Sequence, residues 1–197
     1  NDVRVVAAPP PSSGGIVLVE ALNILEHFDL NAMSADTRMH VIIEAMRRAY
    51  RDRAEFLGDP DFVDVPTARL ITKQYAEPLV VGLDLEHATP SDTLPGIAGG
   101  PEGRDTTHFS IIDHRGNRVA ATLSVNYPFG AASVPPGTGV LLNNQMDDFS
   151  AKLLTPNAYG LVGAHANAIA PGKRPLSSMT PTFLESPQAV GILGTPG

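Results

Sequence analysis

The pattern of apolar and polar positions at the start of the chain predicts a strand followed by a helix. An apolar run at residues 3–8 indicates the strand, and the prolines at 9–11 end it because proline cannot donate a hydrogen bond to a sheet. The Ser-Ser-Gly-Gly sequence at 12–15 is typical of a turn. Residues 16–28 then repeat apolar side chains with a helical period, at Val19, Leu22, Ile24, Leu25 and Phe28.

A longer helix is predicted to begin after Ser34, because serine is a favourable N-cap and Asp36 lies in the first turn. Gly58-Asp59-Pro60 predicts its end. The charged residues between 47 and 55 are placed mostly on the opposite face of the helix from its apolar positions. Those apolar positions are Met39, Ile42, Ile43, Met46, Ala49, Tyr50, Phe56 and Leu57.

A further helical stretch is predicted at residues 67–81, interrupted at Pro78. The composition then changes near Asp84. Residues 84–105 are rich in glycine and proline and show little periodicity, which predicts an exposed and mobile linker. Proteolytic cleavage concentrates in segments of this kind.

After Asp105 the pattern is typical of strands. Residues 106–112 alternate, residues 113–117 form a glycine-containing turn, and residues 119–125 return, which predicts a β-hairpin. Shorter strands are expected at 140–142 and around 189–190, with a loop-rich segment at 150–175. No internal repeat is visible. Helices come first and strands follow, so the fold class is predicted to be α+β.

Composition and charge narrow the class of protein. The chain of 197 residues is 43% hydrophobic and 18% charged, so it can form a core. Its formal net charge of −7 argues against nucleic acid as the main partner, because phosphate binding needs a cationic surface. The absence of cysteine excludes disulfides, cysteine-based zinc sites and cysteine nucleophiles.

The sequence shows neither a membrane-spanning apolar run nor a signal peptide. It starts at Asn1 rather than Met and ends on Thr195-Pro196-Gly197, which is typical of a turn. Both ends suggest cuts through a larger protein, so localisation stays open from this segment.

Motif searches predict neither a metal site nor a cofactor. The sequence lacks G-x-S-x-G, H-E-x-x-H and Walker patterns, and no two histidines are spaced i, i+4. Asp59, Asp61 and Asp64 lie close together and suggest calcium as an alternative. They lack the glycine and distal glutamate of a calcium loop, so loop chemistry at the end of a helix is the favoured interpretation.

The segment Asp105-Thr106-Thr107-His108-Phe109-Ser110 carries the most informative chemistry. By itself it reads as the start of a strand, because threonine favours strands. A threonine hydroxyl is a poor nucleophile and needs a base. Cleavage before Thr106 would supply that base within the same residue, since an α-amine has a pKa near 7.7–8.0.

Several longer motifs place this segment in a family. They include residues 9–15, 54–62, 139–150, 156–163 and 173–181, in the same order and at similar spacing as in known proteins. Together with Thr106-Thr107-His108 they strongly resemble the γ-glutamyltranspeptidase family of N-terminal-nucleophile (Ntn) hydrolases. The resemblance spans almost the whole chain.

The resemblance implies that this chain is part of a four-layer αββα sandwich, with helices in 16–82 and a hairpin from 106. Residues 1–105 would be the C-terminal part of a large subunit, with the linker at about 84–105. Residues 106–197 would begin the small, catalytic subunit. Autocleavage between Asp105 and Thr106 would separate the two, and the family implies a periplasmic or secreted location, with a cytoplasmic one still possible.

The resemblance also assigns roles to individual residues. Thr106 is the expected nucleophile, and Ser124 stands where the family usually has a second threonine beside it. Ser124 keeps the hydroxyl but lacks the methyl group that fixes a rotamer. Gly197 is expected to be the first of two consecutive glycines whose backbone N–H groups stabilise the oxyanion.

The donor substrate would be held by its two charged α-substituents. Asn126, Gln145 and Asp148 match the family's residues for the α-amino group, with Asp147 as the rival of Asp148. Residues 177 and 178, both serine, match the pair that binds the α-carboxylate. The arginine that completes this clamp in the family lies upstream of Asn1, so no arginine of this chain is assigned to it.

Two further features bear on the substrate. Residues 156–160 resemble a lid loop, with Tyr159 as its gate. After Asn126 the sequence continues Tyr-Pro-Phe-Gly, where typical transpeptidases carry small hydroxyl residues before Phe-Gly, so the acceptor side is expected to differ.

Three functional hypotheses follow. The first is transfer or hydrolysis of γ-glutamyl groups from glutathione-like amides, with water or an amino acid or peptide as acceptor. The second is a related acylase of glutaryl or cephalosporin type, whose substrates lack the α-amine that Asp148 would bind. The third is that this segment alone is inactive, because it lacks the remainder of both subunits.

Overall fold

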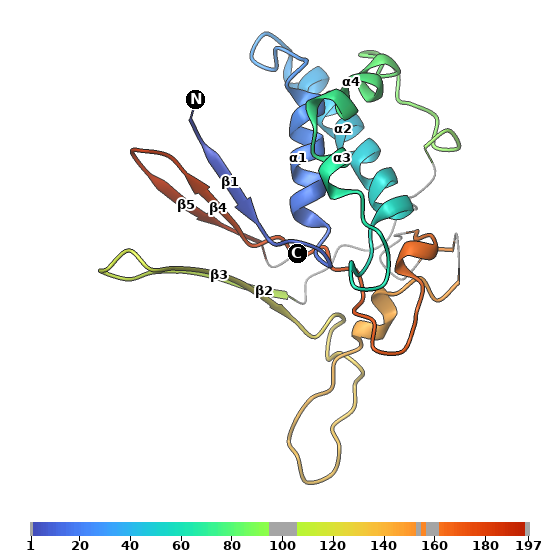
Figure 1. Ribbon diagram of the computed structural model, residues 1–197, viewed down its shortest axis with the longest axis vertical. Coiled ribbons are helices and arrows are strands. Elements are labelled where there is room, and N and C mark those ends of the chain that lie inside the picture. Colours follow the sequence, from blue (N-terminus) through green and yellow to red (C-terminus); the bar gives the residue numbers. More distant parts are fainter. Residues whose placement is uncertain (1, 95–105, 153–154, 157–161, 196–197) are drawn as a thin grey trace.

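The computed structural model describes residues 2–94, 106–152, 155–156 and 162–195 (Figure 1). The predictions for Asp105, Tyr159 and Gly197, and for the bond before Thr106, therefore lie outside the described residues. Within the described ranges, helices gather at one side of the molecule and two small sheets at the other.

The helices confirm the predicted order. Helix α1 spans Gly14–Leu25 and α2 spans Ala35–Phe56, and Ser34 caps α2 as expected by accepting a hydrogen bond of 3.2 Å from the Thr37 N–H. Helix α1 begins earlier and ends earlier than predicted. The first residue of α1, Gly14, lies so close to Thr180 that any side chain there would overlap it. Only glycine permits this close approach.

The prediction that Pro78 interrupts the third helical stretch is wrong. The break lies at Ile71 and Thr72, between α3 (Thr67–Leu70) and α4 (Lys73–Val81), and Pro78 lies inside α4. The Thr72 hydroxyl accepts a hydrogen bond of 3.2 Å from the Tyr75 N–H and so caps α4. A good cap sets where this short helix begins, while Pro78 removes one donor close to its end.

The predicted apolar face of α2 is wrong in part, although its members Ala49 and Leu57 are buried as expected. Met39, Ile43 and Met46 are 57%, 50% and 37% exposed, whereas Arg48 and Asp52 are buried. The charged groups are buried because neighbouring chain supplies their partners. Arg48 donates to the carbonyl of Leu79 at 2.8 Å, to the carbonyl of Gly82 at 3.1 Å and to the carboxylate of Glu44 at 2.7 Å.

The start of the predicted linker is anchored to α2. Side chains at 84–94 are mostly exposed, as expected. The Thr89 carbonyl, however, accepts a hydrogen bond of 2.8 Å from Arg47. The Thr89 hydroxyl accepts a hydrogen bond from Arg48 and donates one to Glu44. Burial raises the pKa of Glu44, but hydrogen bonds from Thr89, Arg48 and Arg47 outweigh it and hold that pKa at about 2.

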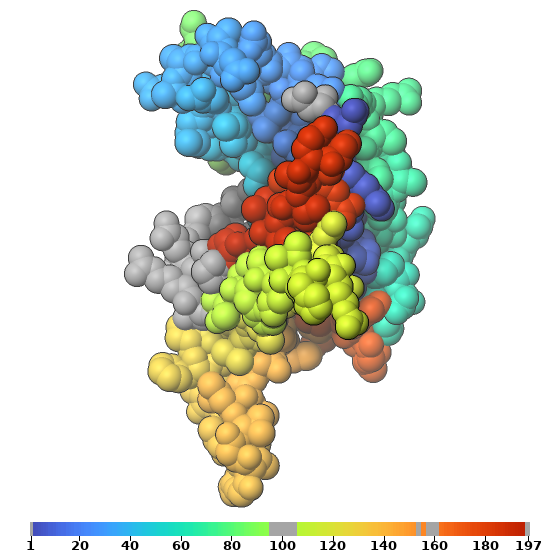
Figure 2. Space-filling view, turned by 90° about the vertical axis from the view of Figure 1, so that its left-hand side faces the viewer, coloured from blue at the N-terminus to red at the C-terminus, as the bar shows by residue number. Residues whose placement is uncertain are grey.

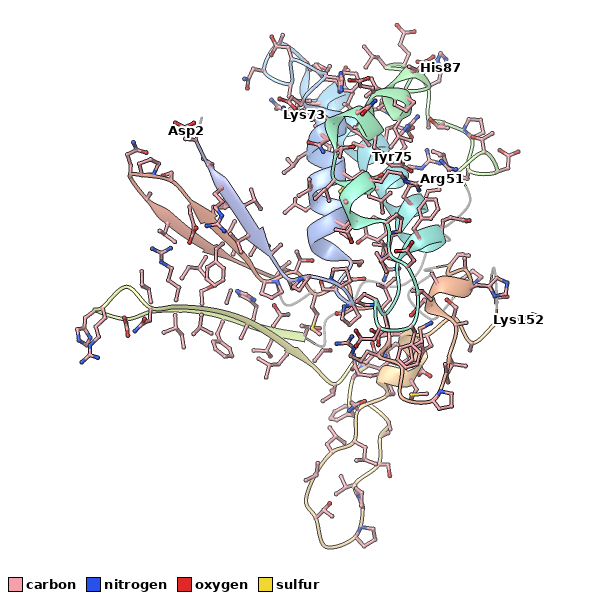
Figure 3. The ribbon with its side chains drawn as sticks, in the orientation of Figure 1. Asp2, Arg51, Lys73, Tyr75, His87 and Lys152 are labelled. Atoms are coloured by element: carbon pink, nitrogen blue, oxygen red, sulfur yellow. The ribbon has the colours of Figure 1, made fainter. Side chains whose placement is uncertain are left out.

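A second buried acid lies between α1 and α2. Glu20 and Asp52 are each 1% exposed, and the Tyr75 hydroxyl donates to Asp52 at 2.6 Å; Tyr75 is labelled in the helical layer in Figure 3. Burial and the neighbouring Asp52 raise the pKa of Glu20 to about 9. Glu20 is therefore protonated at neutral pH, which avoids a second buried negative charge.

The strands form two separate antiparallel sheets. One has the order β1-β4-β5, from Arg4–Ala7, Thr182–Glu185 and Val190–Leu193, with Val5 opposite Leu184. The other is the predicted hairpin of β2 (Thr106–Ile112) and β3 (Arg118–Ser124). Strand β4 was not predicted, and β5 extends the strand expected around 189–190.

The strand predicted at 140–142 is absent from the described residues and a loop takes its place. These three side chains are 57%, 38% and 42% exposed, and no neighbouring strand pairs with them. The Leu142 N–H bonds instead to the Ser133 carbonyl at 3.0 Å, which closes a long excursion seen at the foot of Figure 1. An apolar run without a partner strand cannot form a sheet.

The elements lie in three consecutive layers, which confirms the α+β class (Figure 1). Helices α1 and α2 lie on one side of the β1-β4-β5 sheet, and the hairpin lies on the other. Figure 2 shows the hairpin packed beside the C-terminal strands. The Ser110 hydroxyl donates to the Ile192 carbonyl at 3.3 Å and Arg118 bonds to Glu185 at 2.7 Å across the two sheets.

Candidate active site

The hairpin brings Thr106 and Ser124 together. They are register partners at the open end of the β2–β3 ladder, and the Thr106 hydroxyl donates to the Ser124 hydroxyl at 3.2 Å. The Ser124 oxygen also accepts a hydrogen bond of 2.9 Å from the backbone N–H of Asn126. Two donors converge on one serine oxygen, so Ser124 fixes the direction of the Thr106 side chain.

Asn126 turns the chain from β3 into the next loop. It is 6% exposed with φ of 77°, a left-handed conformation that costs a non-glycine residue on the order of 1 kcal/mol. Its amide donates to the Asn144 carbonyl at 3.1 Å, and the Tyr127 N–H donates to the Asn144 side chain at 2.9 Å. This pair of bonds joins the hairpin to the segment that carries Gln145.

The 3₁₀ helix η1 (Gln145–Asp148) holds two of the predicted binding residues side by side. The Gln145 amide nitrogen donates to the Asp148 carboxylate at 3.1 Å. The Gln145 carbonyl oxygen is buried and has no hydrogen-bond partner among the described residues. A buried unpaired acceptor beside a carboxylate suits a ligand that brings several donors, such as an ammonium group.

The charge on Asp148 is tuned by its surroundings. Burial raises its pKa to about 6, the Arg53 guanidinium opposes that rise, and the Asp147 carboxylate adds to it. Asp148 is therefore ionised at neutral pH but loses its charge in mild acid. An anionic carboxylate in a half-buried position can bind a cation more strongly than an exposed one.

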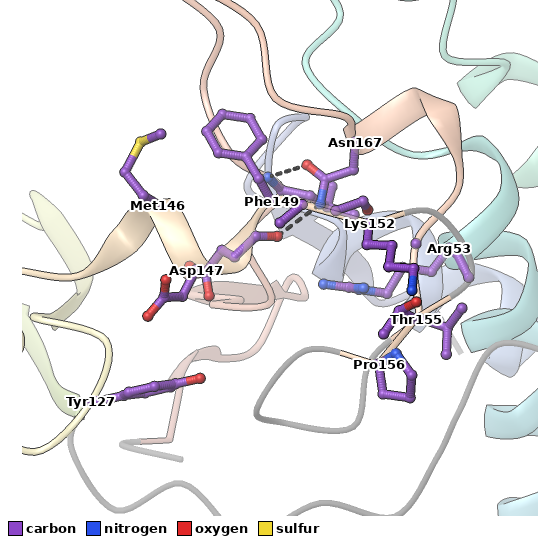
Figure 4. Close-up of a pocket in the computed structure, with 16 residues that line it drawn as sticks. Arg53, Tyr127, Met146, Asp147, Phe149, Lys152, Thr155, Pro156 and Asn167 are labelled. Atoms are coloured by element: carbon purple, nitrogen blue, oxygen red, sulfur yellow. Dashed lines mark hydrogen bonds between the residues drawn. The ribbon is translucent and has the colours of Figure 1, made fainter.

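Asp148 lines a pocket of about 410 Å³, called the Asp148 pocket below (Figure 4). Tyr127 lies on the opposite side of it from Arg53. Asn167 closes the floor by donating to the Asp148 carbonyl at 2.8 Å and accepting from the Leu176 N–H at 3.0 Å. The other lining residues are Ala54, Met146, Asp147, Phe149, Ser150, Ala151, Lys152, Thr155, Pro156, Val162, Gly163 and Leu176.

The nucleophile candidate lies outside the walls of this pocket, as do Ser124, Ser177 and Ser178. Thr106 is linked to it through a chain of hydrogen bonds, from Ser124 to Asn126 and on to the loop that leads into η1. The structure thus brings together the predicted residues Thr106, Ser124, Asn126, Gln145 and Asp148 in one connected network.

The two predicted carboxylate-binding serines lie on a loop held against the start of α1. The Ser177 N–H donates to the Pro11 carbonyl at 2.9 Å, and the Ser13 N–H donates to the Ser177 carbonyl at 2.8 Å. The Ser12 hydroxyl donates to the Met179 carbonyl at 2.7 Å. We call the contact of residues 11–13 with residues 177–179 the serine bridge. Ser178 is exposed, so its hydroxyl is accessible.

Arg53 is a site residue that sequence reasoning missed. It is 6% exposed and donates from Nε to the Ser13 hydroxyl at 3.0 Å and from Nη2 to the Ser178 hydroxyl at 2.9 Å. The pattern of apolar positions predicts it on the polar face of α2. The available signal was its spacing, because the positions four residues before and after it, Ala49 and Leu57, are buried and apolar.

A buried acid, Asp59, holds the chain just before residues 177–179. Asp59 accepts from the Arg174 backbone N–H at 2.8 Å and from its Nε at 2.9 Å, and Arg174 also donates to Asp61 at 2.7 Å. These bonds agree with the interpretation of Asp59 and Asp61 as loop residues. Among the described residues, no three acidic or histidine side chains are grouped so that they could hold a metal ion.

None of the helices in the described part of the chain is long and apolar enough to cross a bilayer.

The chain is similar to known proteins over almost its whole length. The sequence profile of a family described as Gamma-glutamyltranspeptidase matches residues 1–197. The glutathione hydrolase proenzyme of Escherichia coli K12 is 49% identical over 199 residues, which cover 98% of this chain and 34% of that protein. The acylase ACY 1 proenzyme of Pseudomonas sp. strain SE83 is 39% identical over 197 residues, which cover 98% and 33%.

Among solved structures, a cephalosporin acylase from Bacillus halodurans matches with a TM-score of 0.69 and 28% identity, covering 94% of this chain and 31% of that chain. The chain thus spans about a third of the length of the relatives it matches.

Proposed function

Because the chain belongs to the gamma-glutamyltranspeptidase family, we propose that the full-length protein transfers or hydrolyses the γ-glutamyl group of glutathione-like amides. The observation that supports this most directly is the hydrogen-bonded network that joins the Thr106 hydroxyl, through Ser124 and Asn126, to the segment carrying Asp148. It links a nucleophile to a site for a cationic group.

The first step of the proposal is self-cleavage. The Thr106 hydroxyl attacks the Asp105 carbonyl, and the peptide bond between these residues rearranges to an ester that water hydrolyses. The products are a new carboxylate at Asp105 and a free α-amine at Thr106. In the continuous chain that nitrogen is an amide and cannot act as a base, so cleavage creates the catalytic base.

The mature enzyme then works by acyl transfer. The Thr106 α-amine accepts the hydroxyl proton while the oxygen attacks the donor's γ-carbonyl, and the amine of the leaving group takes that proton as it departs. Water or an acceptor amine attacks the acyl-enzyme and releases the product. Ser124 orients the Thr106 oxygen throughout, and Gly197 is proposed to stabilise the oxyanion through its backbone N–H.

The donor is recognised by its zwitterionic α-carbon. Asp148 binds the α-ammonium, and the unpaired Gln145 oxygen and Asn126 complete its acceptors. Ser177 and Ser178 donate to the α-carboxylate. Tyr159 is proposed as the gate of a lid over the bound donor.

The proposed division of the chain places residues 1–105 in a large subunit and residues 106–197 in the small catalytic subunit. The remaining parts of both subunits are then partners of this segment. We expect the segment alone to be inactive, because it supplies only part of the carboxylate clamp and one oxyanion glycine.

The test is release of p-nitroaniline from γ-glutamyl-p-nitroanilide by the full-length protein. Mass spectrometry first establishes cleavage between Asp105 and Thr106. Cleaved protein that releases no nitroaniline contradicts the proposal. Release by residues 1–197 alone contradicts the expectation of inactivity.

An acylase acting on glutaryl-type side chains is the second candidate, because relatives named as acylases also match nearly the whole chain. Glutaryl donors carry no α-amine, so Asp148 has no partner in them. Asp148→Ala is expected to remove activity on a γ-glutamyl donor and to spare activity on a glutaryl donor. Wild-type protein that prefers glutaryl-p-nitroanilide over the γ-glutamyl compound favours the acylase.

A further inference from the structure

We infer that Arg53 is a positioning residue that turns the Ser178 hydroxyl toward the α-carboxylate of the donor, an inference that rests on the proposed function. The guanidinium is 6% exposed and lies over the Tyr50 ring at 5.8 Å from the ring centroid. A charge buried to this extent is stable only when it is engaged by well-placed acceptors. Its two hydrogen bonds go to Ser13 and Ser178.

The direction of these bonds carries the inference. An arginine N–H can only donate, so the oxygens of Ser13 and Ser178 must both accept from Arg53. Ser13 places its own hydrogen on the Ser177 carbonyl at 2.8 Å. The Ser178 hydrogen has no acceptor among the described residues, and this side chain is exposed. Arg53 therefore makes Ser178 a donor to whatever binds beside it, which suits a carboxylate.

The position of Arg53 relates this serine to Asp148. Arg53 lines the Asp148 pocket, and its charge acts on the Asp148 carboxylate in opposition to the effect of burial. The Arg53 guanidinium also donates from Nη2 to the exposed hydroxyl of Ser178. One cation thus lies between the residue proposed for the donor's ammonium and the residue proposed for its carboxylate. It does not need to touch the donor to orient the Ser178 hydroxyl.

The experiment is a double-mutant cycle in the cleaved full-length protein, using Arg53→Met, Ser178→Ala and the double variant. Loss of a charge-assisted hydrogen bond predicts that Arg53→Met lowers kcat/KM for γ-glutamyl-p-nitroanilide by about 10- to 100-fold, mainly through KM. The kcat/KM of the double variant is expected to lie within about twofold of that of Ser178→Ala, because the effects of residues that act through one another are not additive. Losses that multiply overturn the inference.

A truncated donor separates positioning from general support of the fold. The anilide of 4-aminobutyrate lacks the α-carboxylate, so Arg53→Met is expected to change its kcat/KM by less than about threefold relative to wild type. An equal loss on both donors shows a structural role and overturns the inference. Where wild type turns this donor over too slowly to measure, the double-mutant cycle decides alone.

Two controls complete the design. Arg38→Met removes an exposed arginine from the same helix and is expected to match wild type. If Arg53→Met does not cleave itself, Arg53→Lys, which keeps the charge but loses the fork, replaces it in the same cycle. Wild-type protein without activity on the γ-glutamyl donor contradicts the proposed function, whereas an active wild type with additive losses contradicts only the role of Arg53.

Discussion

The helical region and the hairpin region differ in how they treat apolar side chains. In the helical region, Ile24, Val41, Ala45 and Ala49 are fully buried within this chain. In the hairpin, apolar side chains stay between 42% and 59% exposed, namely Phe109, Ile111, Ile112, Val119 and Leu123. A two-stranded hairpin is at best marginally stable alone, so it depends on the layers packed against it.

The residues proposed to take part in the reaction lie mostly in the hairpin region, where little apolar surface is buried. The proposed nucleophile and the residues proposed for the donor's amine lie on the hairpin and its loops, while α2 contributes Arg53 from the packed side. The comparison teaches that the helical region buries the apolar core, whereas the hairpin region carries the proposed reactive residues. The two regions meet at the Asp148 pocket, which Arg53 of α2 lines together with Tyr127 and Asp148.

The largest expected effect tests the reactive side of this comparison. Thr106→Ala in the full-length protein removes the nucleophile of both reactions, so no cleavage is expected and nitroaniline release should fall by about 10⁴-fold or more. Stability measured by urea unfolding should hardly change. The matched control is Thr107→Ala, because Thr107 is the exposed neighbour in β2. Comparable losses in both variants would refute the assignment of Thr106.

The stable side is tested by Ile24→Ala. Ile24 is fully buried among helices α1, α2 and α4, and removing its branched side chain is expected to lower the free energy of unfolding by about 2–5 kcal/mol. At a temperature where the variant is folded, kcat should stay near the wild-type value. Leu22→Ala, at a position 46% exposed on the same helix, should cost much less. A change in kcat without a change in stability would break the comparison.

The third prediction concerns pH. With its pKa raised to about 6, Asp148 loses its charge as the pH falls below that value. The inhibition constant of L-glutamate should therefore rise about tenfold for each pH unit below 6. Neither charged group on the α-carbon of L-glutamate titrates between pH 5 and pH 8. Binding is therefore measured as competitive inhibition of nitroaniline release over this range.

Asp147→Asn is the matched variant for that measurement. Asp147 raises the pKa of Asp148, so its neutralisation should move the midpoint to lower pH. A midpoint that does not move, or that moves upward, contradicts the electrostatic account of the pocket.

The smallest effect is expected for Ser124→Thr. The added methyl group restricts the hydroxyl rotamer, so kcat should rise by no more than about threefold. Ser124→Ala removes the acceptor that both the Thr106 hydroxyl and the Asn126 N–H use, so it should lower kcat by about tenfold. Equal rates in the threonine and alanine variants would show that the second hydroxyl does not orient the first.

Local patterns predicted the elements whose determinants are local. The Ser34 cap, the long helix α2 and the hairpin from Thr106 are all confirmed. Strand β4 was missed because its pairing with β1 joins residues far apart in the sequence, such as Val5 and Leu184. No window of neighbouring residues contains that information.

The site was predictable to the extent that its residues match a family. That resemblance selected Thr106, Ser124 and Asp148, and the structure shows the hydrogen bonds around them. It did not select Arg53, since burial of a guanidinium depends on acceptors at Ser13 and Ser178, which come from elsewhere in the chain. Part of the apolar face of α2, at Met39, Ile43 and Met46, was misjudged for the same reason.

The serine bridge has a consequence for how donor preference changes in such proteins. The backbone of the loop at 177–179 is held by hydrogen bonds to residues 11–13, while the Ser178 hydroxyl accepts from Arg53 at 2.9 Å and the Ser177 hydroxyl accepts from the Met179 N–H at 3.1 Å. A side chain at 178 that still accepts from Arg53 can therefore replace serine while the backbone stays in place. Relatives named as glutathione hydrolases and relatives named as acylases are both similar to this one chain. Because residues 11–13 hold the backbone of this loop, a few substitutions of its side chains are enough for that divergence.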